Sequence, residues 1–199
     1  MPTRMVFITH SLRSASLTLL LALLLTFTAM SARAGSIEPV QGQLTPGEDG
    51  YALSAEFAID LGARLEEAVA RGVPLNFILE FTLERKRWYW GDEHIASRII
   101  DYRLSYNALT QQYRLSVGGL HSGFATLPEA LHVLGRVAGL VVADKSAITL
   151  GNSYVVALRL SLDKSQLPKP LQLDALGSKD WQVEAKTLRW QFAPGAMGR

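Results

Sequence analysis

Basic and aromatic side chains gather most densely at residues 85–90. The run is Arg85, Lys86, Arg87, Trp88, Tyr89 and Trp90. Tryptophan, tyrosine and arginine dominate the energetics of protein interfaces, and tryptophan also stacks on sugar rings and cations. These residue types at this density predict a binding surface. The alternative is a strand end whose rings pack into the core while the Arg and Lys stems cover its rim.

A second group of residues could do acid–base or metal chemistry, namely Asp92, Glu93 and His94. Carboxylate and imidazole groups suit zinc or manganese, so the alternative hypothesis is a periplasmic enzyme that acts on glycan or peptide through these residues. The other histidines after residue 34, His121 and His132, lie in separate segments. No His-x-His or His-x-x-x-His pair supports a metal site.

Other catalytic patterns are missing from the sequence. The chain has no cysteine, which excludes thiol chemistry and thiolate zinc sites. It has no Gly-x-Ser-x-Gly elbow, and Gly118-Gly119 lacks the spacing of a phosphate loop. Ser122 follows His121, but neighbours along a chain rarely face one another. We therefore predict no catalytic residue, no cofactor and no metal, and a protein that is not an enzyme.

The first 34 residues have the order of a secretory signal peptide. Arg4 and Arg13 precede an apolar run at residues 17–25, and Ala32-Arg33-Ala34 follows as a small-x-small cleavage site. We predict cleavage after Ala34, with a retained membrane anchor as the alternative. Cleavage removes three of the 20 basic residues and leaves them nearly equal to the 18 acidic ones. This balance gives no reason to expect nucleic acid as a partner, and we predict a periplasmic protein without stable membrane insertion.

The binding residues must be positioned by the long alternating stretch that precedes them, residues 73–90. Side chains on a strand point alternately to opposite faces, so five apolar residues share one face. They are Leu75, Phe77, Leu79, Phe81 and Leu83. The other face is mostly polar. This pattern predicts a strand with one dry face within an antiparallel sheet.

Similar alternation predicts strands elsewhere, at residues 37–44, 51–59, 98–107, 113–117, 140–142, 154–162 and 181–192. Pro39 places the first of these at a sheet edge, and a change of phase near Thr187 indicates a bulge. Asp60 is the expected N-cap of a helix that ends at Gly72, and Thr126 with Glu129 forms a capping box for a second helix. Residues 118–125 are predicted to form a glycine-rich connection.

These elements predict a mainly β fold, an antiparallel β-sandwich that is immunoglobulin-like in architecture and carries two short helices. We expect one domain over residues 35–193 and a loose tail over residues 194–199.

Four segments resemble one family of secreted bacterial proteins, the domain of unknown function 4390. They are R-W-Y-W at 87–90, Y-R-L-S-Y-N-A-L-T-Q-Q-Y-R-L at 102–115, G-L-H-S-G-F-A-T-L-P-E-A-L at 119–131 and Q-L-P-K-P-L-Q-L-D-A-L at 166–176. The resemblance implies no known reaction, cofactor or catalytic residue. It implies that the gene often lies beside one for a membrane sensor histidine kinase. We therefore expect an exported binding module of the cell envelope, with that kinase as a candidate partner.

Overall fold

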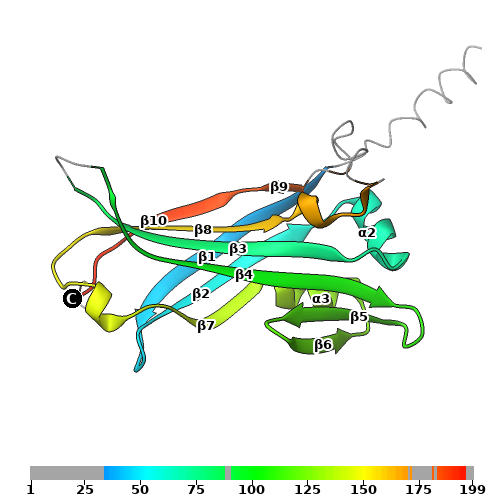
Figure 1. The fold of residues 1–199 in the computed structure, drawn as a ribbon, viewed down its shortest axis with the longest axis horizontal. Coiled ribbons are helices and arrows are strands. Elements are labelled where there is room, and N and C mark those ends of the chain that lie inside the picture. Colours follow the sequence, from blue (N-terminus) through cyan, green and yellow to red (C-terminus); the bar gives the residue numbers. More distant parts are fainter. Residues whose placement is uncertain (1–33, 88–90, 170, 172–180, 182, 196–199) are drawn as a thin grey trace, which may run out of the picture. The chain divides into compact units, whose positions relative to one another are not determined.

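The computed structural model describes residues 34–87, 91–169, 171, 181 and 183–195, and their strands form two sheets (Figure 1). Residues 1–33 of the predicted signal peptide, Trp88–Trp90 and residues 196–199 lie outside the described residues. The predictions made for them stay predictions. Among the helices that are described, none has the length and apolar composition needed to cross a membrane.

One sheet has four strands and the other has six. The four-stranded sheet has the order β7-β2-β1-β9, with β1 (Gly35–Pro46), β2 (Tyr51–Asp60), β7 (Arg136–Ala143) and β9 (Val183–Ala185). The six-stranded sheet has the order β10-β8-β3-β4-β5-β6, with β3 (Leu75–Arg85), β4 (Glu93–Asn107), β5 (Gln112–Val117), β6 (Leu120–Phe124), β8 (Tyr154–Leu162) and β10 (Thr187–Phe192). The helices are α2 (Ala63–Ala70) and α3 (Leu127–Leu134), with single 3-10 turns η1 (Lys145–Ala147) and η2 (Lys164–Gln166).

Strand β3 lies inside the six-stranded sheet, as its alternation predicts. It pairs antiparallel with β4 on one side and with β8 on the other. The predicted dry face is buried from Leu75 to Leu83, with every alternate side chain at most 1% exposed. Ile78 on the opposite face is only partly buried. The period-two pattern of the sequence therefore fixes which face of β3 meets the core.

The two sheets pack on each other around one apolar core, and no polar side chain among the described residues is buried. In Figure 1, β1 and β2 run obliquely behind the strands of the larger sheet. Gly42 of β1 faces β10, where a Cβ atom would lie 2.7 Å from Leu188 Cδ2 and 3.2 Å from the ring of Trp190. The predicted mainly β, two-sheet fold is confirmed. The immunoglobulin-like architecture is not confirmed, and one strand pair, β1 with β9, is parallel.

The two helices are present, and their ends differ from the prediction. Helix α2 begins after Gly62, whose φ of 73° favours glycine. Asp60 is not its N-cap, because the Asp60 carboxylate instead accepts the Gly62 N–H at 2.9 Å and supports the turn before the helix. The N-cap of α3 is confirmed, since Thr126 Oγ1 accepts the Glu129 N–H. Helix α3 ends at Leu134, and β7 begins at Arg136, earlier than the strand predicted at residues 140–142.

Two features of the sheets correct the sequence interpretation. The glycine-rich segment after β5 holds a tight turn at Gly118 and Gly119, with φ of 52° and 87°, and then a further edge strand, β6. The phase change near Thr187 is a crossing between sheets and not a bulge. Strand β9 lies in the four-stranded sheet and β10 in the six-stranded sheet, with Lys186 between them. The crossing changes which alternate side chains face the core.

Candidate functional site

The basic residues of the predicted binding surface lie at the end of the β3–β4 hairpin (Figure 1). The last pair of β3 with β4 is Arg85 with Glu93, and the last pair of β3 with β8 is Arg85 with Tyr154. Residues 86–92 therefore continue beyond the strand pairs on both sides of β3. Two long paired strands position this hairpin end, and β8 pairs with β3 only as far as Arg85.

One carboxylate organises the described part of the hairpin end. Arg85 Nη2 and Arg87 Nη2 both donate to Glu93 Oε2, and the three side chains are about one-third exposed. Partial desolvation acts to raise the pKa of Glu93. The hydrogen bonds and positive charges of Arg85 and Arg87 outweigh that effect, so the pKa lies below the ordinary value of 4.5. Glu93 thus stays charged at neutral pH and holds the two guanidinium groups together.

The remaining residues of the predicted surface divide into one that is described and three that are not. Lys86 is exposed and lies between the two arginines in sequence. Trp88, Tyr89 and Trp90 lie outside the described residues, so the predicted split of their rings between two faces stays a prediction.

The alternative site at Asp92, Glu93 and His94 does not converge in this geometry. Adjacent residues on a strand point to opposite faces, so Glu93 and His94 diverge. Glu93 is also engaged by two arginines. Within residues 34–87, 91–169 and the short described segments after them, no three His, Cys, Asp or Glu side chains come close enough to share a metal ion. The geometry gives this alternative no support.

Strands β5 and β6 bring together a serine and a histidine that the sequence did not link. Ser116 pairs with His121 across the two strands, and His121 Nδ1 lies 2.7 Å from Ser116 Oγ. The sequence suggests only Ser122, the neighbour of His121 along the chain, because it does not reveal strand β6. The pair lies on an open sheet face, and a serine hydrolase also needs an acid that orients the histidine and donors for an oxyanion. Ser116 pairs in β4 with Arg103, which is a cation and cannot orient the imidazole as a carboxylate does.

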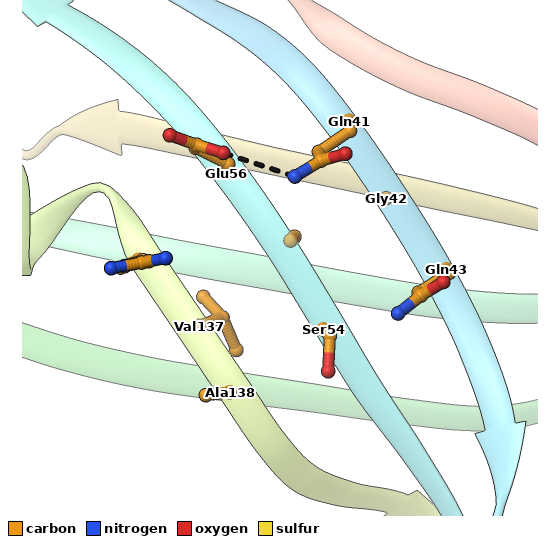
Figure 2. Close-up of a pocket in the computed structure, with 9 residues that line it drawn as sticks. Gln41, Gly42, Gln43, Ser54, Glu56, Val137 and Ala138 are labelled. Carbon is orange, nitrogen blue, oxygen red and sulfur yellow. Dashed lines mark hydrogen bonds between the residues drawn. The ribbon is translucent and has the colours of Figure 1, made fainter.

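A polar pocket of about 250 Å³ lies on the four-stranded sheet, between β1, β2 and β7 (Figure 2). Gln41 of β1 and Glu56 of the neighbouring strand β2 both line it, and Gln41 Nε2 donates to Glu56 Oε2 at 3.0 Å. On the β7 side a register shift opposite Ser54 frees the Gly139 N–H, which donates to Ser54 Oγ at 3.4 Å. The pocket offers hydrogen-bonding groups around one carboxylate that already has a partner. It could hold a small polar molecule, but it does not present a pair of acids.

Comparison with known proteins gives one match. No curated protein and no solved structure matches the chain. The model of a protein family described as "Domain of unknown function (DUF4390)" matches residues 34–191. This match covers most of the 199 residues, including every described strand except the last residue of β10. The chain therefore belongs to the DUF4390 family.

Proposed function

We propose that this chain is an exported, non-enzymatic interaction module of the cell envelope, which binds a protein partner through residues 85–90. The signal-peptide pattern supports export. The resemblance to this family implies that the gene often lies beside one for a membrane sensor histidine kinase. The extracytoplasmic domain of such a kinase is therefore the candidate partner.

The observation that carries the proposal is the shared carboxylate of Glu93. It fixes Arg85 and Arg87 next to each other at the end of a hairpin, before any partner binds. Long side chains normally lose conformational entropy when they bind, so side chains that are already held in place lose less. Arginine and tryptophan are the residues most enriched among those that dominate binding energies. A fixed cationic end that leads into three aromatic residues suits an acidic patch on a protein surface.

Titration calorimetry of the mature chain with the purified extracytoplasmic domain of the neighbouring kinase tests the proposal. We expect saturable binding that the Arg87→Glu substitution weakens by about tenfold or more, because one attraction becomes a repulsion. Arg64→Glu is the matched control, because Arg64 is exposed on α2. Helix α2 precedes the start of β3, whereas the hairpin end follows the other end of that strand. Equal affinities of the wild type and the Arg87→Glu variant would contradict the role of this surface.

The aromatic part of the surface needs its own test. Changing Trp88 and Trp90 together to alanine should reduce the same affinity while leaving the circular dichroism spectrum of the sheets unchanged. A folded double variant that binds as tightly as the wild type would remove these two residues from the binding surface.

A further inference from the structure

A groove lies between helices α2 and α3 and beside strand β5. It consists of two adjoining hollows of about 510 and 600 Å³, which share Glu66 of α2 and Pro128 and Leu131 of α3. One hollow extends to Val40 of β1, and the other extends to Tyr113 of β5. The nearest ends of the two helices are 57 residues apart in sequence. The groove is therefore formed by the fold and not by a local motif.

The floor and walls of the groove are largely apolar. The side of α2 that lines it presents Ala63 and Ala70, which are small and exposed, so the helix leaves room for another side chain. At one end, Val40 is 61% exposed because a β-bulge between Pro39 and Gln41 turns it out of the regular pattern of β1. This apolar lining gives the groove room for the apolar side chains of an occupant.

The rim of the groove is acidic, and its carboxylates differ in how they are engaged. Glu56 accepts from Gln41, and Asp60 accepts a backbone N–H. Glu67 pairs with Arg71 at 2.6 Å on the outside of α2. The carboxylate of the remaining acid, Glu66, has neither a hydrogen bond nor an ion pair within the described part of the chain, although the Glu66 backbone N–H donates to Gly62 O.

The position of Glu66 makes this difference informative. It is the acidic residue that both hollows share, so its carboxylate lies near the middle of the groove with apolar surface on either side. The other charged or titratable groups that line the groove are Glu56, Asp60, Glu67, Tyr113 and His132, and none of them is a fixed cation. An occupant that matches this lining has one positive charge at its centre and apolar groups on both sides of that charge.

We propose that the groove between α2 and α3 binds an amphipathic segment of a partner protein, in which a lysine or arginine that meets Glu66 is flanked by apolar side chains. Two hollows joined at a central carboxylate suit a chain with side chains on both sides of the cation. Docking of an amphipathic segment in a groove through regularly spaced apolar anchors is a common form of peptide recognition. This surface is separate from the hairpin end, so the proposal for the groove does not depend on the proposed function above.

Fluorescence anisotropy with a labelled synthetic peptide tests the proposal. The probe has a single lysine between pairs of leucines, with serine-rich ends, and the matched probe has glutamate in place of the lysine. We expect the wild-type chain to bind the lysine peptide saturably and at least about tenfold more tightly than the glutamate peptide, which corresponds to a difference of about 1.4 kcal/mol. Equal binding of the two peptides, or no saturable binding, would overturn the proposal.

Variants then place the peptide in the groove. Glu66→Lys should reverse the preference between the two peptides, and Glu48→Lys, an equal charge change in the exposed β1–β2 turn, should leave it unchanged. Ala70→Trp, which fills one hollow without a charge change, should weaken both peptides. If the Glu66→Lys variant is folded and keeps the wild-type preference, the proposal fails. It also fails if sedimentation shows that the free chain forms a dimer that Ala70→Trp abolishes, because a second copy would then be the occupant.

Discussion

The two faces of β3 can be compared directly by shortening two neighbouring side chains, Leu79 and Ile78. Leu79 is 1% exposed and lies between Ile100 of β4 and Leu160 of β8. Replacing a buried leucine by alanine removes its transfer free energy and leaves a cavity, which costs about 3 kcal/mol. Ile78 is partly exposed on the opposite face, so Ile78→Ala should cost only about 1 kcal/mol. Ile78→Ala gives up the higher β-propensity of a β-branched residue, so a larger loss for Leu79→Ala reports burial.

Urea unfolding of the mature chain measures this difference. We expect the unfolding midpoint of Leu79→Ala to fall well below that of Ile78→Ala, with similar slopes. For a domain of this size, about 3 kcal/mol corresponds to a loss of about 6–12 °C in the melting temperature. A larger loss for Ile78→Ala would mean that β3 is shifted by one residue, which reverses its faces, and equal losses would mean that neither face is preferentially buried. Such a result would refute the assignment of the core.

Three further predictions concern a glycine, a helix cap and a carboxylate. Gly135→Ala should destabilise the fold by about 2 kcal/mol or more, because the new Cβ would lie 2.4 Å from a backbone oxygen of β2. Gly151→Ala should cost less in thermal melts, because, its own residue and its chain neighbours aside, no atom of the described residues lies within 4 Å of a Cβ there and only the positive φ of 85° opposes the change. Thr126→Ala should cost about 1 kcal/mol in urea unfolding, because α3 loses its N-cap acceptor, and a loss below about 0.3 kcal/mol would contradict that role. The pKa of Glu93, followed by carbon NMR, should lie below 4.5, so the stability that its charge provides is complete above the ordinary pKa and is lost as the pH falls through the lowered value. Replacing both of its arginine partners by glutamine should return the pKa toward the ordinary value, and an unchanged pKa would show that the arginines do not hold it.

The sequence predicts those parts of the fold that depend on local alternation. The segment from Leu75 to Leu83 predicts both the strand and its buried face, because every second residue is large and apolar. The same rule explains two of the failures. Strand β6 carries exposed polar residues such as His121 and Ser122, and it has no apolar alternation that could reveal it. The phase change at Thr187 was seen, but alternation alone cannot distinguish a bulge from a strand that leaves one sheet for another.

The candidate surfaces were predictable only in part. The density of Arg85, Lys86 and Arg87 is visible in the sequence, whereas the role of Glu93 is not. Glu93 is next to His94 in sequence and suggested a metal site, and only the pairing of β3 with β4 places it against the arginines. The groove around Glu66 could not be predicted, because it depends on how far apart the fold sets two helices that do not adjoin in sequence.

The proposed function makes its most direct claim about where a partner touches the chain. A photo-reactive amino acid placed at Lys86, in cells that produce the full chain, measures this contact. A matched position is Asp101, which is exposed on β4. The account predicts one defined cross-linked envelope protein from position 86, lost when Arg87→Glu is added, and none from position 101. The same adducts from both positions, or an adduct at position 86 that survives Arg87→Glu, would contradict the hairpin end as the binding surface.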